Sequence, residues 1–509
     1  MTLTLLRRRV GPVPVLVFAT GVALLALLPL GFVVWATIST GWAEAEKLIF
    51  RPRTGELLWN TVRLTAGAVA LCAVIGTATA WLVERSNLPV RKAFHVLLTA
   101  PLAIPAFVNS YAWVSLLPSA TGYGGALLIV TLSYFPFVHL PVAAAFQGLD
   151  PALEETAHAL GLSRWRTFTR VVLPQLRPAL LGGALLVALH LLAEFGALQM
   201  LRFPTFTTAI YDQYQSTYNG PAANMLAVVL VLCCLLLLVG ELKGRGRARL
   251  SRVGTGVARP ATRARLGRAA IPVLTALCVL VALSLAVPLA SLTYWLSGSS
   301  AEFDAEMIAA TATTSLALGA LGAVCTVGLA IPVAWLVVRH RNALSTFLER
   351  STYFGNALPG IVVALALVTI GIQVVPGLYQ TTVMLLAAYA ILFLPRAVVN
   401  VRSALAQAPP VLDDVAHSLG SGRLAAFRRV TLPLIAPGLG AGAALVFIAV
   451  VTELTATLLL APIGTTTLAT QFWSHSDSAA YGAAAPYAAL MVLLSVPATY
   501  LLTREGIRR

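Results

Sequence analysis

Two glutamates in this sequence lie where a charge is costly, because a long run of apolar residues surrounds each of them. Glu194 and Glu453 occupy equivalent positions in two similar stretches, 259 residues apart. Ionisable side chains inside such runs usually face a partner or a cavity. Carboxylate oxygens are hard donors that suit a hard cation. The symmetric pair therefore predicts a transient metal contact on a central pathway; the alternative is that each glutamate is protonated or hydrogen-bonded between helices.

Three further side chains are candidates for the same pathway. His190 lies one helical turn before Glu194 and could share its face, although its counterpart in the second stretch is Ala449. Tyr211 and Tyr214 follow in the segment after this apolar run. The tyrosines could contact cargo or an outer partner, and the alternative is an ordinary interfacial aromatic belt.

Two polar loops that interrupt the apolar runs indicate a different chemistry. The stretch "EETAHALGLSRWRTFTRVVLP" covers Glu154 to Pro174, and "DDVAHSLGSGRLAAFRRVTLP" covers Asp413 to Pro433. Aligned without a gap, residues 151–180 and 410–439 are identical at 14 of 30 positions. A repeat of this kind predicts one structural unit that the chain uses twice.

Each polar loop predicts a short helical elbow. A proline at the first helical position and two acidic residues in the first turn favour a helix start. A glycine then ends this helix, because glycine accepts the left-handed conformation of a C-cap. A second short helix with an exposed phenylalanine follows, and a proline introduces the next apolar run. The residues that we assign to the two elbows are Glu154, Glu155, Ala157, Gly161, Phe168 and Pro174, and Asp413, Asp414, Ala416, Gly420, Phe427 and Pro433.

Two equivalent elbows predict two equivalent docking surfaces. Leaving Phe168 and Phe427 toward water would be unfavourable unless something covers them. We therefore expect a dimeric cytoplasmic partner. The alternative is an amphipathic helix on lipid headgroups, which explains the basic residues but not the repeated order of acid, glycine, phenylalanine and proline.

Membrane-spanning helices must position these residues. The chain of 509 residues is 58% hydrophobic and only 11% charged, with a mean hydropathy of +0.85. Its apolar runs are long enough to span a bilayer as helices, whereas barrel strands would be shorter and would alternate. We predict an all-α polytopic membrane protein with about twelve transmembrane helices, at roughly 12–38, 58–83, 95–117, 124–146, 178–200, 222–241, 270–296, 306–338, 350–374, 379–403, 436–461 and 483–503.

The net charge of +16 is concentrated in alternate connecting segments, which include both elbows and both termini. The positive-inside rule then places these segments in the cytoplasm. Orientation and anionic lipid headgroups explain the basic excess, so nucleic-acid binding is not expected.

The internal repeat divides the chain into two halves of six spans. An even number of spans per half makes the repeats parallel, related by an axis along the membrane normal. We predict a first repeat at 1–241 with its elbow at 150–177, a basic cytoplasmic linker at 242–268, and a second repeat at 269–509 with its elbow at 409–435.

The sequence contains no phosphate-binding G-x-x-x-x-G-K-[ST] and no H-E-x-x-H. ATP hydrolysis must then belong to another polypeptide, and we expect neither an enzymatic activity nor a bound cofactor in this chain. The five cysteines lie in apolar runs without C-x-x-C spacing, which is typical of packing residues rather than metal ligands.

Both elbows resemble the EAA loop of ABC importer permeases, which implies the type I permease fold. In that family the loop forms a coupling helix in a groove of the ATP-binding subunit, so the resemblance implies two copies of an ATPase that holds ATP and Mg²⁺. The second elbow has Asp for the motif's Glu, and both lack its middle Ala, at Thr156 and Val415. The positions that match the motif are Glu155 and Asp414, Ala157 and Ala416, and Gly161 and Gly420.

Three stretches of the first half narrow the resemblance: "RSNLPVRKAFHVLLTAPLAIPAFVNSYAW" (85–113), "SYFPFVHLPVAAAF" (133–146) and "FPTFTTAIYDQY" (203–214). They are similar to fused permeases of ferric-iron importers in the bacterial cell membrane. This implies a substrate-binding protein as a partner and Fe³⁺ as the cation for Glu194 and Glu453. Permeases for thiamine or a phosphonate remain alternatives. In an ion-coupled secondary transporter the glutamates would relay protons, but such a carrier does not need the elbows.

Overall fold

The computed structural model describes residues 12–215, 217, 220–245, 263–298, 304–356 and 358–508. These ranges are helical, and their β-structure is one isolated parallel bridge between Ser86 and Ala264. The predicted all-α class is confirmed. Of the predicted linker at 242–268, residues 246–262 lie outside the described ranges.

The chain packs as two compact units, and each unit combines segments from both predicted repeats. The first long helix of each repeat is grouped with the main body of the other repeat. Packing and sequence similarity therefore divide the chain differently. Unit 1 comprises Met1–Ile49, Gln213–Val231 and Glu302–Ser474, and unit 2 comprises Phe50–Asp212, Leu232–Ala301 and His475–Arg509.

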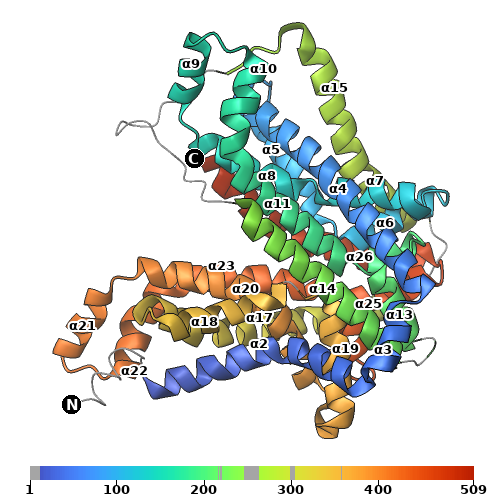
Figure 1. Ribbon diagram of the computed structural model, residues 1–509, viewed down its shortest axis with the longest axis vertical. Coiled ribbons are helices and arrows are strands. Elements are labelled where there is room, and N and C mark those ends of the chain that lie inside the picture. The colour runs from blue at the N-terminus through green and yellow to red at the C-terminus, as the bar shows by residue number, and fades with distance from the viewer. Residues whose placement is uncertain are drawn as a thin grey trace. The chain divides into compact units, whose positions relative to one another are not determined.

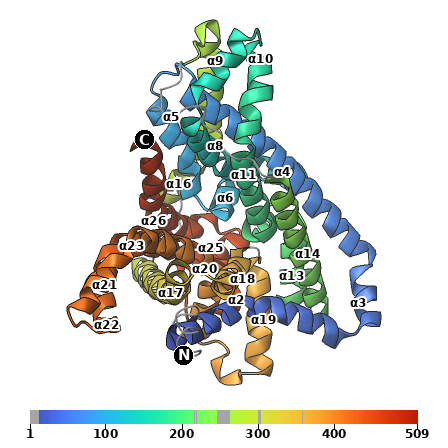
Figure 2. The same cartoon turned by 60° about the vertical axis from the view of Figure 1, so that its left-hand side comes forward.

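Unit 1 is built around the long helix α17 (Ala305–Arg339), which packs on α2, α20 and α23. Figure 2 shows α2 beside α18 and α19, which it also contacts. The other elements of unit 1 are α2 (Val13–Thr40), α3 (Trp42–Ile49), α18 (Ala343–Thr352), η5 (Tyr353–Asn356), α19 (Gly360–Gln373), η6 (Pro376–Leu378), α20 (Thr382–Gln407), α21 (Pro410–Ser418), α22 (Arg423–Ala426), η7 (Phe427–Thr431), α23 (Leu432–Val451) and α24 (Thr455–Leu460).

Unit 2 is built around α4 (Pro52–Arg85), which packs on α7, α8 and α11. Its other elements are α5 (Arg91–Thr99), η1 (Ala100–Ala103), α6 (Ala106–Leu116), α7 (Gly122–Tyr134), α8 (Pro136–Gly148), α9 (Pro151–Ala159), α10 (Arg164–Thr167), η2 (Phe168–Val172), α11 (Leu173–Ala193), α12 (Gly196–Met200), η3 (Gly267–Ala269), α15 (Ala270–Val281), η4 (Ala282–Ala286), α16 (Val287–Gly298) and α26 (Tyr481–Arg508). Both units receive parts of α13 (Phe206–Gln215), α14 (Gly220–Arg245) and α25 (Leu468–Asp477).

Small residues allow the central helices to approach their neighbours closely. A Cβ added to Gly76 of α4 would lie 2.7 Å from the Val138 Cβ of α8. A Cβ added to Gly319 of α17 would lie 2.9 Å from the Phe447 ring of α23. Close backbone approach of this kind is how helices associate where no hydrophobic driving force from water exists. The helices around α4 and α17 therefore form tightly packed bundles.

The described residues contain nine helices that are long and apolar enough to cross a membrane, or eleven when two bent pairs count as single spans. The bends are 89° between Arg91–Ala103 and Ala106–Leu116, and 101° between Ala343–Gly355 and Gly360–Gln373. The remaining predicted span, at 483–503, corresponds to α26, whose apolar part Tyr481–Pro497 is shorter. Prolines precede both second helices, at Pro105 and Pro359, and break the helical hydrogen bonding there.

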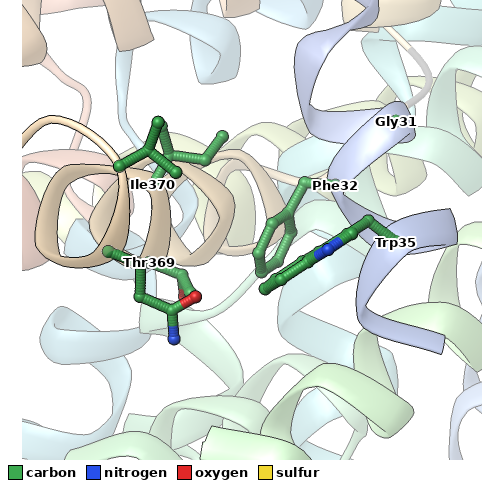
Figure 3. Close-up of a pocket in the computed structure, with 7 residues that line it drawn as sticks. Gly31, Phe32, Trp35, Thr369 and Ile370 are labelled. Carbon is green, nitrogen blue, oxygen red and sulfur yellow. The ribbon is translucent and has the colours of Figure 1, made fainter. Parts of the chain in front are cut away.

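An apolar pocket of about 260 Å³ lies between α2 and α19 in unit 1. Figure 3 shows Phe32 and Trp35 of α2 facing Thr369 and Ile370 of α19. Aromatic and aliphatic carbon forms most of its wall, which does not suit a charged or hydrated cargo.

Candidate functional site

The first elbow folds as the sequence predicts, with a short helix closed by a left-handed glycine. Asp150 caps α9, because its carboxylate accepts a hydrogen bond from the Ala152 amide at 3.0 Å. Gly161 has φ +82°. Its amide donates to the His158 carbonyl at 2.9 Å, and the Leu162 amide donates to the Ala157 carbonyl at 3.0 Å. These two bonds form a Schellman motif, which satisfies the last carbonyls of the helix.

The second elbow repeats this geometry. Gly420 has φ +83°, and its amide donates to the His417 carbonyl at 3.0 Å. The Ser421 amide donates to the Ala416 carbonyl at 2.9 Å. The left-handed glycine predicted for both elbows is thus confirmed, and Ala157 and Ala416 are buried beneath the two turns.

A histidine that was not among the predicted site residues also closes each turn. The Nδ1 atoms of His158 and His417 lie 3.1 Å and 2.9 Å from the carbonyl oxygens of Leu162 and Ser421. A carbonyl only accepts hydrogen bonds, so Nδ1 carries the proton in both histidines when these bonds form. The sequence contains one signal of this role, because the same histidine occurs at the equivalent position of both repeats.

The exposed apolar surface of the elbows differs from the expectation. Phe168 and Phe427 are half-buried rather than exposed, and the Trp165 ring stacks on Phe168 with centroids 6.0 Å apart. The exposed positions are instead Leu160 and its equivalent Leu419, and Trp165 and its equivalent Leu424. Their exposed fractions are 78%, 81%, 73% and 71% for Leu160, Leu419, Trp165 and Leu424. These four exposed apolar side chains are the candidate contacts of the elbows with a partner.

After each elbow the chain enters the next long helix through one π-helical turn. These turns are η2 and η7, and each begins at the repeated phenylalanine. Pro174 and Pro433 then occupy the first turns of α11 and α23. Single π-helical turns are frequent at functional sites. Figure 1 shows the elbow helices at one end of each unit, next to α11 in one and α23 in the other.

The two acidic residues of each elbow have different environments. Glu155 and Asp414 are exposed, whereas Glu154 and Asp413 are half-buried. Glu154 lies 3.3 Å from the Arg85 guanidinium, and Asp413 lies 3.1 Å from that of Arg339. In the sequence both arginines look like ordinary basic residues at the end of an apolar run.

Glu194 lies at a break between α11 and α12. Its Oε1 accepts a hydrogen bond from the Ala197 amide at 3.0 Å, and its Oε2 accepts one from the Tyr134 hydroxyl at 2.5 Å. A carboxylate at a helix start satisfies free amides and interacts favourably with the helix dipole. This agrees with the hydrogen-bonded alternative for Glu194.

Glu453 lies at the equivalent break between α23 and α24. Its Oε1 accepts from the Ala456 amide at 2.9 Å, and its Oε2 accepts from the Thr457 amide at 2.9 Å and the Thr457 hydroxyl at 2.7 Å. Glu194 belongs to unit 2 and Glu453 to unit 1. Among the described residues, no group of three or more His, Cys, Asp and Glu side chains is arranged to hold a metal ion.

His190 and Tyr211 lie close to Glu194. The His190 ring is 4.4 Å from Phe137 and 6.1 Å from Tyr134, whose hydroxyl donates to Glu194. Tyr211 packs on Phe195, the residue after Glu194, at 4.5 Å between ring centroids. The structure therefore places His190 in the ring cluster of Tyr134 and Phe137 that supports Glu194, and Tyr211 in a separate ring pair with Phe195.

Tyr214 lies outside this cluster, in unit 1. Burial raises the pKa of Tyr214 to about 12, and the neighbouring Tyr379 adds to the shift. The phenol therefore stays protonated at neutral pH.

The sequence matches the family described as "Binding-protein-dependent transport system inner membrane component" at residues 73–241 and again at 326–504. The chain belongs to this permease family. Each matched segment contains one elbow and one helix-break glutamate, so the permease carries the family domain twice.

Several curated proteins resemble the permease. It is 39% identical over 490 residues to the Fe(3+)-transport system permease protein FbpB 2 of Haemophilus influenzae, covering 94% of this chain and 96% of that protein. It is 31% identical over 238 residues to the sulfate transport system permease protein CysT of Escherichia coli, covering 43% and 86%. It is 29% identical over 192 residues to the molybdate/tungstate transport system permease protein WtpB of Thermococcus kodakarensis, covering 36% and 76%.

The coverage of these matches distinguishes two architectures. The sulfate relative aligns along most of its own length with less than half of the permease, which is about the length of one repeat. The Haemophilus relative aligns along nearly the whole of both chains. The permease is therefore a fused, two-repeat protein of the ABC importer type, and an ion-coupled secondary transporter is not favoured.

Proposed function

We propose that the permease is the membrane-spanning subunit of an ATP-driven importer for ferric iron, which a substrate-binding protein delivers. The choice of ferric iron as the cargo is based on the 39% identity, along 94% of the chain, to a permease named for Fe(3+) transport. The relatives named for sulfate and molybdate match a shorter part of the chain at lower identity. Thiamine and phosphonate, which the resemblance left open, are not favoured by these relatives.

Energy enters through the elbows, where two copies of a separate ATPase dock, each holding its own ATP and Mg²⁺. Leu160 and Leu419 expose equivalent apolar side chains, and so do Trp165 and Leu424. Two copies of one partner would explain why both elbows keep the same turn and the same exposed positions. The permease itself contributes no hydrolytic chemistry.

The elbows and both termini face the cytoplasm in this proposal. The support is the concentration of Lys and Arg in alternate connecting segments. The substrate-binding protein then docks on the opposite side of the bacterial cell membrane. The proposed repeats keep the boundaries 1–241 and 269–509, with the linker 242–268 between them.

The proposed cargo path includes Glu194 and Glu453, with His190 one helical turn before Glu194 and with Tyr211 and Tyr214 in the segment after it. At rest both carboxylates accept hydrogen bonds from the starts of short helices. A passing Fe³⁺ would compete for oxygens that are already held in place, which suits transient contact rather than storage.

Uptake by proteoliposomes tests this function. The permease, its ATPase and its unloaded binding protein are reconstituted, and uptake of ⁵⁵Fe³⁺, ³⁵S-sulfate, ⁹⁹Mo-molybdate and ¹⁴C-thiamine is compared with and without ATP. We expect ATP-dependent accumulation of iron alone. Accumulation of one of the other cargoes, with no iron uptake, would contradict the proposed substrate.

A further inference from the structure

Each elbow forms an ion pair with the end of a long helix. These two pairs indicate how a movement of the elbow could pass to the membrane-spanning helices. Arg85 is the last residue of α4 and Arg339 is the last residue of α17. These are equivalent helices, and each is the central helix of its unit. Each arginine pairs with the inward-facing acid of the nearby elbow, Glu154 or Asp413. An arginine–acid ion pair thus occurs at the equivalent place twice, between residues more than 65 positions apart in the chain. Arg339 also donates a hydrogen bond to Asp413, whereas the contact of Arg85 with Glu154 is ionic.

Both pairs are largely withdrawn from water. The side chains of Arg85 and Glu154 are 8% and 29% exposed, and those of Arg339 and Asp413 are 10% and 25% exposed. Buried and partly buried pairs are screened much less by salt than exposed ones. Breaking such a pair by removing one partner is costly, because the other charge is left uncompensated. These pairs therefore differ from exposed surface pairs such as Arg53 and Glu56.

A third group fixes each pair in place. The Arg85 Nη2 also donates to the Phe146 carbonyl near the end of α8 at 3.2 Å. In the other unit the third group acts on the acid, because the Thr431 hydroxyl donates to Asp413 at 2.5 Å. The position equivalent to Thr431 in the first repeat is Val172, which has no hydroxyl. A backbone carbonyl thus supports the arginine in one unit, and a threonine hydroxyl supports the acid in the other. Both stabilise the contact between the elbow and the central helix.

The central helices are suited to pass movement on. A side chain at Gly76 or Gly319 would collide with the neighbouring helix, so α4 and α17 cannot slide past their neighbours without repacking. Densely packed interiors transmit displacement rather than absorb it. A shift at the Arg85 or Arg339 end is therefore delivered to the whole bundle.

We propose that Arg85 and Arg339 are positioning residues that fasten each elbow to the end of its central helix, so that a displacement of the elbow moves α4 and α17. The inference rests on the proposed docking of ATPase subunits at the elbows. It does not depend on the cargo. The exposed docking positions, Leu160 and Leu419, directly precede the two turn glycines. Neither leucine takes part in an ion pair.

The test measures movement without any cargo. Trp59 of α4 and Met307 of α17 are exposed and lie near the helix ends opposite the arginines. Spin labels at Trp59→Cys and Met307→Cys, with the five native cysteines replaced by alanine, report the distance between the two helices by pulsed electron resonance. The distance is measured in the reconstituted permease–ATPase complex with and without ATP, and ATPase affinity is measured on the same samples.

We expect the ATP-driven distance change to fall at least twofold in the double variant Arg85→Met/Arg339→Met, while ATPase affinity stays within about threefold of the parent. A full distance change in this variant would overturn the proposal. A loss of ATPase binding would also overturn it, because the arginines would then support the docking surface itself.

Conservative variants keep the proposal testable if the methionine variants do not fold. Arg85→Lys/Arg339→Lys retains both charges but loses the forked guanidinium, and we expect a smaller reduction of the distance change. Glu154→Asp and Asp413→Glu exchange the acids of the two elbows and should retain most of the movement. An unchanged distance change with the lysine pair would contradict the positioning role. The distance measurement uses no cargo, so its result does not depend on whether the permease imports iron. An error in the proposed substrate would be detected by the uptake experiment alone.

Discussion

The two elbows follow the same backbone course but stabilise it with different side chains. Both end their first helix at a left-handed glycine, both close the turn with a histidine, and both enter the next span through a π-helical turn. They differ in their capping, because Asp150 caps α9 whereas α21 begins after Pro409 without a side-chain cap. The shared features are those that a pair of identical partners would require. The differences lie in local support and in one exposed side chain, which is Trp165 in the first elbow and Leu424 in the second.

The two glutamates at the helix breaks, Glu194 and Glu453, also share one backbone arrangement but are supported by different side chains. Tyr134 donates directly to Glu194, and the second-repeat residue Tyr389 lies 2.9 Å from the Thr457 hydroxyl, which in turn donates to Glu453. The first repeat has Leu198 at the position of Thr457, so the tyrosine there must reach the carboxylate itself. A carboxylate held against a helix start has thus been kept while its supporting contacts have diverged.

The largest effect is expected from breaking what the elbows share. Gly161→Val with Gly420→Val places a branched side chain at φ +82° and +83°, which costs roughly 1–2 kcal/mol per residue and displaces the Schellman turn. We expect the ATPase to be lost from the permease when the complex is purified from membranes.

Gly422→Val is the matched control for this experiment. It lies two residues from Gly420, its φ is not in the left-handed range, and an added Cβ meets nothing within 4 Å. Retention of the ATPase by the Gly161/Gly420 double variant would show that the turn geometry is not needed for docking.

The exposed apolar positions should give the next largest effect. Central interface side chains commonly contribute about 2 kcal/mol or more, which corresponds to roughly 30-fold in affinity. Leu160→Asp with Leu419→Asp should therefore weaken ATPase binding by at least this factor, measured by surface plasmon resonance. Trp165→Ala should weaken it more than Leu424→Ala, because the indole buries a larger area. Equal losses for Trp165 and Leu424 would mean that the two surfaces are not used in the same way.

A smaller effect should distinguish the two helix-break glutamates. Tyr134→Phe removes a direct donor to Glu194, and hydrogen bonds to charged groups contribute about 1.5–3 kcal/mol. Tyr389→Phe leaves all three hydrogen bonds of Glu453 in place, so its cost should be nearer 1 kcal/mol. Thermal unfolding of the purified permease compares the two variants. A larger loss of stability for Tyr389→Phe would refute the comparison.

The smallest effect concerns the support of the second elbow. Thr431→Val gives this elbow the residue found at the equivalent position of the first, and it removes one hydrogen bond to Asp413. We expect faster amide hydrogen exchange in α21, by up to about tenfold for a contribution near 1 kcal/mol, with α9 unchanged. Val172→Thr is the reciprocal control, and acceleration in α9 by Thr431→Val would contradict a local role.

The sequence predicted the helical class, the repeat and the turn geometry of the elbows because these depend on local patterns. Proline at the helix start, acids in the first turn and glycine at its end specify the elbow without reference to the rest of the chain. The membrane-spanning segments were predicted from the length of each apolar run alone. This predicted each bent pair as one span, but it could not predict the bends near Pro105 and Pro359.

Features that depend on distant residues could not be predicted in this way. The pairs of Arg85 with Glu154 and of Arg339 with Asp413 join different helices, and the arginines resembled ordinary cytoplasmic charges. The half-burial of Phe168 was missed because Trp165 stacks on it, and this contact depends on how the second helix turns. The grouping of each first helix with the other repeat's helices likewise depends on tertiary packing rather than on similarity.

Native mass spectrometry of the assembled transporter tests the central claim, that two equivalent elbows each take one ATPase subunit, most directly. The parent permease should carry two ATPase copies, and the variant with Leu160→Asp and Leu419→Asp should carry none at the same concentrations. Two ATPase copies bound to that double variant would contradict the account, because the energy input would then lie elsewhere on the permease.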